Sequence, residues 1–124
     1  MGTILSAKNI YKTYKTSSGD VPALRGVSLE VEKGMFYAII GKSGSGKSTL
    51  LHTLSGLDRP TKGEVFINGE NLYQYSDEKM AVFRRRYMGF VFQQFNLLDE
   101  FNVLNNICMP LKLDQRKVDK QFLE

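Results

Sequence analysis

The N-terminal part of the chain alternates apolar and polar residues in the manner of β-strands. Val27–Glu32 alternates strictly, which predicts a strand buried on one face. Thr3–Ile10 predicts a first strand at the edge of a sheet. Ser17–Pro22, which lies between them, has the composition of a loop. Lys33-Gly34 then predicts a turn into the next element.

A continuous apolar run follows this turn and does not alternate. Met35–Ile40 therefore predicts a strand covered on both faces, as in a parallel sheet. Further on, leucines recur at helical spacing and predict an amphipathic helix with its apolar face at Leu50, Leu51, Leu54 and Leu57. Gly56 stands near the expected end of that helix.

The middle of the chain predicts a hairpin and then a helix. Glu64–Gly69 is typical of a strand that ends in an Asn-Gly turn. Ser76 is expected to cap a helix that has acidic residues in its first turn and an apolar stripe at Met80, Phe83 and Tyr87.

The last part predicts one more strand and two short helices. Gly89–Phe92 is expected to be the strand. One helix should begin after Asn102 and be interrupted at Pro110, and the other should begin after Asp114.

A glycine-rich motif separates the predicted strand at Met35–Ile40 from the leucine-rich helix. Residues 41–48 read G-K-S-G-S-G-K-S, the G-x-x-x-x-G-K-S pattern of a phosphate-binding loop. Its three glycines allow backbone amides to form a concave anion site at a helix N-terminus. Lys47 can then reach the β- and γ-phosphates, while the Ser48 hydroxyl ligates Mg²⁺. A glycine-rich turn without a ligand is the disfavoured alternative.

Composition narrows the class of protein without choosing a ligand. The chain has 124 residues, 42% hydrophobic and 24% charged, as in a soluble globular domain. Its net charge of +4 is too small to select a partner. The apolar runs are too short to span a bilayer, and no leader is recognised, so a cytoplasmic protein is expected. The single cysteine, Cys108, is expected to be a buried small side chain.

Three other features have simpler explanations than a functional site. Arg84-Arg85-Arg86 is expected to form a solvated helix face, and no nucleic-acid partner is predicted. His52 is expected on the polar side of its helix. Leu97-Leu98-Asp99-Glu100 is similar to a Walker B motif, but Asn96 interrupts the apolar run, so a polar connector is the better interpretation.

The chain closely resembles the ATP-binding subunit of an ABC transporter, of the bacterial branch for lipoprotein release, macrolide export and antimicrobial-peptide export. The resemblance covers essentially the whole chain. It is carried, in this order, by Lys12-Thr13-Tyr14, Ala23–Leu29, Gly41–Thr49, Gly63-Glu64-Val65 and Gly89–Leu98. The phosphate-binding loop together with Phe-Gln-Gln-Phe-Asn-Leu-Leu is highly specific.

The resemblance implies a role for each matching residue. Tyr14 would stack on adenine, and Gln93, in the Q-loop, would contact Mg²⁺ and the attacking water, with Gln94 as second choice. Lys47 and Gln93 would thus serve catalysis, and Ser48 and Gln93 would ligate Mg²⁺. The other residues implied to bind ATP are Gly41, Ser43, Gly44, Ser45, Gly46 and Thr49.

The family fold implied is an α/β P-loop NTPase (RecA-like) core with an N-terminal antiparallel β portion. Residues 1–92 would form the N-terminal part of this core, and residues 93–124 the Q-loop and the beginning of the helical subdomain. The implied partners are a membrane permease, which would hold the subunit at the inner face of the cell membrane, and a second copy of the subunit.

The sequence also departs from the family pattern. It has no L-S-G-G-Q signature, no qualifying Walker B motif and no switch histidine, which predicts an N-terminal half that binds nucleotide without turnover. The strands that flank Met35–Ile40 in the family would then be missing, and the apolar side chains of this segment would be exposed to water. An ATP-hydrolysing exporter subunit and a non-hydrolysing nucleotide-binding fragment both remain open. A small kinase or GTPase is the distant third, since no N-K-x-D motif occurs.

Overall fold

The computed structural model describes residues 2–119 and 121. The chain forms two compact units, residues 1–80 and residues 81–124. The predicted division into residues 1–92, part of the ATP-binding core, and residues 93–124, the Q-loop and the start of the helical subdomain, remains a prediction.

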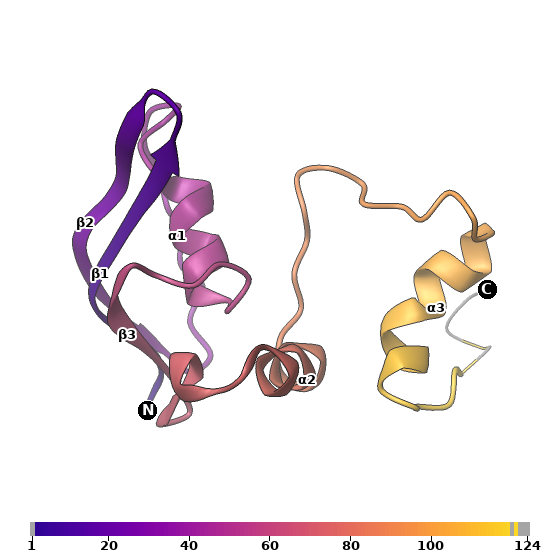
Figure 1. Ribbon diagram of the computed structural model, residues 1–124. Coiled ribbons are helices and arrows are strands. Elements are labelled where there is room, and N and C mark those ends of the chain that lie inside the picture. Colours follow the sequence, from indigo (N-terminus) through magenta and orange to yellow (C-terminus); the bar gives the residue numbers. More distant parts are fainter. Residues whose placement is uncertain (1, 120, 122–124) are drawn as a thin grey trace. The chain divides into compact units, whose positions relative to one another are not determined.

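The first unit is built on an antiparallel sheet, as expected for the N-terminal portion. Strands β1 (Thr3–Thr16) and β2 (Gly19–Glu32) form a long hairpin (Figure 1). The sheet continues through β3 (Lys62–Ile67) to the short β4 (Glu70–Asn71), in the order β2-β1-β3-β4. The prediction of an edge strand at Thr3–Ile10 was therefore wrong, because β1 has a partner on each side.

The two hairpin turns differ in how well the sequence predicted them. Asn68 and Gly69 both have positive φ angles, 50° and 80°, which confirms the Asn-Gly turn between β3 and β4. The expected loop over Ser17–Pro22 is in fact a two-residue turn, and Pro22 lies within β2, opposite Thr13. Proline is tolerated here because β2 is an edge strand and its register with β1 shifts at this point.

The buried strand predicted at Met35–Ile40 is not formed. Residues 35–42 are neither helix nor strand, and Phe36 and Ile40 are 94% and 91% exposed. A strand requires a hydrogen-bonded neighbour, and among the described residues the sheet gives this segment none. The expected exposure of apolar residues here is confirmed.

Helix α1 (Lys47–Leu54) follows the glycine-rich motif and lies alongside the β1–β2 hairpin (Figure 1). Leu50, Thr53 and Leu54 are buried, whereas Leu51 and Leu57 are 47% and 38% exposed, so half of the predicted leucine face enters the core. Gly56, with φ 74°, follows the helix end as expected. The rest of this core comes from the sheet and the segment after it, with Ala7, Ile10, Leu24, Val65, Ile67, Leu72 and Met80.

The helix predicted after Ser76 is confirmed. A short 3₁₀ turn, η1 (Leu72–Gln74), precedes α2 (Asp77–Tyr87), and the Ser76 hydroxyl accepts a hydrogen bond from the Lys79 amide at 3.3 Å. Phe83 is buried, and Tyr87, although 65% exposed, keeps its ring 4.8 Å from that of Phe83.

Among the described residues after α2, the α-helix is α3 (Val103–Leu113). It runs through Pro110, so the predicted interruption was wrong. Gly89–Phe92 does not form the predicted strand, and Val91 is 97% exposed. After Asp114, residues 115–119 are not helical, and the rest of the second predicted helix lies largely outside the described residues. In the described part of the chain, no helix has the length and apolar character needed to cross a membrane.

Asp114 organises the end of α3 through three arginines. Arg85 and Arg86 approach one carboxylate oxygen at 3.1 and 3.0 Å, and Arg116 approaches the other at 2.9 Å. The side chain of Asp114 is only 5% exposed. The prediction of a solvated helix face fits Arg86, which is 53% exposed, but not Arg85, which is 25% exposed, and both also bind a carboxylate.

Candidate nucleotide-binding site

The motif at residues 41–48 forms a tight turn that leads directly into α1. The Ser45 amide donates to the Lys42 carbonyl at 3.1 Å, and Gly44 and Gly46 have φ angles of 77° and 97°. The Leu50 amide then donates to the Gly46 carbonyl at 2.8 Å, which begins the helix. The expected placement of the loop at a helix N-terminus is confirmed.

Gly46 is required for space as well as for its backbone angle. A Cβ atom at this position would lie 2.7 Å from the Ala23 carbonyl oxygen and 3.3 Å from a methyl carbon of Leu24, both on β2. The loop is therefore pressed against the hairpin, and any side chain would push it away. This contact connects the β portion of the fold to the shape of the loop.

Lys47 is held over the loop by hydrogen bonds to the loop itself. Its ammonium donates to the carbonyl oxygens of Gly41 and Lys42 at 2.8 and 2.7 Å, and to the Ser45 hydroxyl at 3.3 Å. These three acceptors match the three donors of an ammonium group. The positive charge is thus positioned at the loop, as a ligand for phosphate requires.

The first turn of α1 supplies further donors for an anion. Amide groups in the first turn of a helix have no acceptor within the helix, and the helix dipole favours negative charge at this end. Residues 41–45 and Ser48 are exposed, and Gly46, Lys47 and Thr49 are half-buried. The predicted phosphate-binding residues therefore lie together, in reach of a ligand from solution.

The oxygen chemistry at the loop fits Mg²⁺. Ser48 is exposed in the first turn of α1, where its hydroxyl can bind a cation that bridges to phosphate oxygens. Within the described residues, no cluster of three or more His, Cys, Asp or Glu side chains could hold a metal ion. Phosphate oxygens and water would complete the shell of a magnesium ion here.

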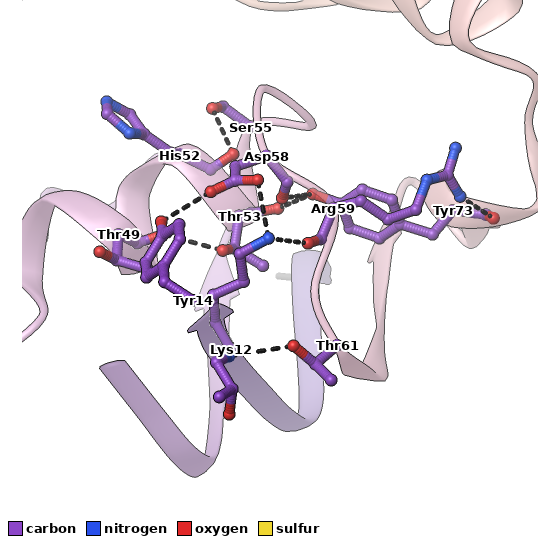
Figure 2. Close-up of polar contacts among 11 residues, drawn as sticks. Lys12, Tyr14, Thr49, His52, Thr53, Ser55, Asp58, Arg59, Thr61 and Tyr73 are labelled. Carbon is purple, nitrogen blue, oxygen red and sulfur yellow. Dashed lines mark hydrogen bonds and ion pairs between the residues drawn. The ribbon is translucent and has the colours of Figure 1, made fainter. Parts of the chain in front are cut away.

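Tyr14 stands near the end of β1, and its hydroxyl donates to a carboxylate oxygen of Asp58 at 2.7 Å (Figure 2). The tyrosine is 37% exposed. Burial and the hydrogen bond to Asp58 raise the pKa of Tyr14, whereas a hydrogen bond with the Thr49 side chain acts in the opposite direction. Tyr14 and Thr49, both predicted to bind ATP, are therefore neighbours.

The other residues that the sequence singled out are each described within their own unit. Gln93 and Gln94 are exposed at a bend in the second unit, and the predicted contact of Gln93 with Mg²⁺ remains a prediction. The connector predicted at Leu97–Glu100 is confirmed, since it contains neither helix nor strand. Cys108 is buried as expected. His52 is half-buried, and its charge lowers the pKa of Asp58.

Sequence reasoning did not single out Lys12 and Asp58 as partners of Tyr14. Lys12 and Asp58 form an ion pair with a 2.9 Å separation, and the Lys12 ammonium lies 5.1 Å from the centre of the Tyr14 ring (Figure 2). Asp58 is 44 residues away from Tyr14 along the chain, in a connector without a binding motif. The only signal was the proximity of Lys12 to Tyr14 in a segment that matches the family.

Comparison with known proteins agrees with this geometry. The family described as "ABC transporter" matches residues 24–124. The bacitracin export ATP-binding protein BceA of Halalkalibacterium halodurans is 41% identical, over 96% of this chain and 48% of that protein. The lipoprotein-releasing system ATP-binding protein LolD of Acinetobacter baylyi is 44% identical, over 89% of this chain and 48% of that protein.

Solved structures show the same fold. The dimeric structure of the ATP-binding cassette MJ0796 in a post-hydrolysis state, bound to ADP and Pi, aligns with a TM-score of 0.86 and 41% identity. The alignment covers 93% of this chain and 50% of that chain. The chain thus spans about half the length of the relatives it matches.

Proposed function

Because the chain belongs to the ABC transporter family, we propose that it binds MgATP through the loop at residues 41–48. The observation that carries this proposal is the placement of the Lys47 ammonium over a glycine-rich turn at the N-terminus of α1. Backbone amides and a cation converge there, as recognition of a polyphosphate requires. The MJ0796 cassette, whose structure is bound to ADP and Pi, supports a nucleotide as the ligand.

Each residue of the proposed site has a distinct role. The amides of residues 43–49 would surround the phosphates, Lys47 would neutralise their charge, and the Ser48 hydroxyl would bind Mg²⁺. Tyr14 would stack on adenine, because an aromatic ring binds a base through its face without hydrogen-bond readout. Gln93 would complete the magnesium shell and orient the attacking water in the assembled site.

We propose that the whole protein is the ATP-binding subunit of an exporter. The names of its relatives, a bacitracin export protein and a lipoprotein-releasing system protein, support this class of function. The partners would be a membrane permease, which would place the subunit at the inner face of the membrane, and a second copy of the subunit. The dimeric MJ0796 structure supports pairing of cassettes.

Calorimetric titration with MgATP tests the nucleotide site. Lys47→Ala removes a charge-assisted contact, and we expect affinity for MgATP to fall by about 10- to 100-fold. Lys42→Ala removes the same charge from the same loop but leaves the bonded ammonium of Lys47 in place, so the loss should be no more than about threefold. Equal affinities of the Lys47→Ala variant and the unmodified chain would contradict the proposal.

Phosphate release from the same samples separates an ATPase from a nucleotide-binding module. Hydrolysis requires an activated water in a closed site, in addition to bound phosphates. If the unmodified chain releases phosphate from ATP and the Lys47→Ala variant does not, ATP hydrolysis belongs to this chain. Binding without release would support the alternative of a non-hydrolysing nucleotide-binding fragment.

A further inference from the structure

A compact polar network surrounds the hydroxyl of Tyr14. Asp58 accepts a hydrogen bond from Tyr14 through one carboxylate oxygen at 2.7 Å, and from Lys12 through the other at 2.9 Å (Figure 2). Lys12 also donates to the Arg59 carbonyl at 2.7 Å. The tyrosine is therefore bonded directly to Asp58, in the short connector that follows α1, and Lys12 beside it is bonded to the same connector at Asp58 and Arg59.

Asp58 is itself held firmly by its neighbours. The hydroxyl of Tyr73 donates to the main-chain carbonyls of Thr53, at the end of α1, and of Asp58. Arg59 donates to the Tyr73 carbonyl at 2.8 Å and lies against the Tyr73 ring. These bonds hold the main chain at Asp58, and the hydrogen bonds from Lys12 and Tyr14 hold its carboxylate.

The charges in this network favour an ionised Asp58. Burial alone raises the pKa of Asp58, but hydrogen bonds from Lys12 and Tyr14, together with the Lys12 and His52 charges, outweigh it and lower the pKa. The Lys12 side chain is 15% exposed and that of Asp58 31%, so the pair is partly shielded from water. A carboxylate in this state is a strong acceptor for the Tyr14 hydroxyl.

The position of Lys12 leaves only one side of the ring for a base. Its ammonium lies over one face of Tyr14, 5.1 Å from the ring centre, which is within cation–π range. A base that stacks on Tyr14 must therefore use the opposite face. A ring held in one orientation also loses less conformational entropy when the base binds.

We propose that Asp58 and Lys12 are positioning residues that hold the Tyr14 ring for stacking on the base of a bound nucleotide. This inference rests on the proposed function and adds the residues that set affinity for the base. The same bonds would also be present if these residues only stabilised the packing of β1 against the connector. The two roles differ in their effect on a ligand that has phosphates but no base.

The test compares MgATP with magnesium tripolyphosphate in calorimetric titrations of the 124-residue chain. Tyr14→Phe keeps the ring and removes its bond to Asp58. We expect affinity for MgATP to fall by about three- to tenfold, the range for immobilising one side chain, and affinity for tripolyphosphate to stay unchanged. Tyr11→Phe, which removes a hydroxyl from the same strand, should change neither affinity.

Two results for Tyr14→Phe would overturn the proposal. One is an unchanged affinity for MgATP, and the other is an equal loss for both ligands, which would indicate a purely structural tie. A failure of the unmodified chain to bind either ligand would instead refute the proposed function, and this inference with it. Binding of both ligands with no effect of the substitution would refute the inference alone.

Asp58→Ala, made with and without Tyr14→Phe, tests whether Asp58 acts through the tyrosine. We expect Asp58→Ala to weaken MgATP binding in the unmodified chain and to have a smaller effect in the Tyr14→Phe background, because the hydroxyl it orients is absent there. If Asp58→Ala lowered the affinity for MgATP by the same factor in both backgrounds, this coupling would be contradicted. If Asp58→Ala does not fold, as judged by circular dichroism, the Tyr14→Phe comparison alone decides.

Discussion

Asp114 is the most heavily bonded carboxylate in the described part of the second unit. The hydrogen bond from Arg86, supported by that from Arg85 and by the charges of Arg86 and Arg116, lowers its pKa, although burial acts in the opposite direction. Neighbouring Arg85 and Arg86 come from α2, whereas Asp114 and Arg116 follow α3. The carboxylate therefore joins the end of α2 to the end of α3 within this unit.

Asp114→Asn should lower the melting temperature at neutral pH, because the arginines lose the charge that they share. A group with a lowered pKa in the folded state stabilises above its ordinary pKa of 3.8, and the contribution disappears as the pH falls through the folded value. The stability difference between the unmodified chain and Asp114→Asn should thus be constant from about pH 7 to 5 and shrink below about pH 4.

Thermal unfolding followed by circular dichroism at several pH values measures this difference. Asp99→Asn is the matched control, since Asp99 lies in an exposed turn of the same unit. A difference for Asp114→Asn that persists unchanged to pH 2, or one no larger than that of Asp99→Asn at pH 7, would contradict the role assigned to the carboxylate.

For single residues, the sequence predicted those of the phosphate-binding loop but not the two carboxylates, Asp58 and Asp114, that connect distant segments. Lys47, Ser48 and Thr49 could be predicted because the motif fixes their spacing on one turn of helix. Asp58 could not, because Tyr14 lies 44 residues away, and for Asp114 only Arg116 is near in sequence, whereas Arg86 and Arg85 lie 28 and 29 residues away. Such contacts arise only from tertiary packing.

Helix α3 depends on a polar cap at its beginning. The Asn102 side chain accepts a hydrogen bond from the Asn105 amide at 2.8 Å. The Asn106 side chain donates to the carbonyls of Leu98, Phe101 and Asn102 and so closes the preceding loop onto the helix. A cap of this kind stabilises a helix that contains a proline, since Pro110 removes one helical donor.

Asn102→Ala should reduce the free energy of unfolding by about 1 kcal/mol, the usual effect of losing an N-cap side chain. Urea titration followed by helical circular dichroism measures it. Asn105→Ala changes the same residue type within the first turn and loses a hydrogen bond from the Lys112 ammonium, but alanine favours helix there, so its effect should be smaller than that of Asn102→Ala. Equal destabilisation by both variants would show that the Asn102 side chain does not act as a cap.

Elements with local signals were predicted well, and elements that need a partner were not. The cap at Ser76, the helix start after Asn102 and the Asn-Gly turn each follow from side chains and backbone angles within a few residues. Met35–Ile40 and Gly89–Phe92 have the apolar character of strands, but a strand forms only with a hydrogen-bonded neighbour. Apolar pattern alone could not supply that neighbour.

For the whole molecule, the order of motifs along the chain carried the prediction of its family. The phosphate-binding loop and the Phe-Gln-Gln-Phe-Asn-Leu-Leu segment identified the ABC transporter family, and the alignment with MJ0796 confirms it at a TM-score of 0.86. The cargo of the proposed exporter could not be predicted, because nothing in a nucleotide-binding loop depends on it.

Amide chemical shifts of the ¹⁵N-labelled chain, followed during titration with MgATP, report where the phosphates bind. Amides of residues 43–49 should shift together and saturate with one affinity, and Lys47→Ala should strongly reduce these shifts at a nucleotide concentration that half-saturates the unmodified chain. Shifts confined to other parts of the chain, or none at saturating nucleotide, would show that backbone groups at the start of α1 do not bind a polyphosphate.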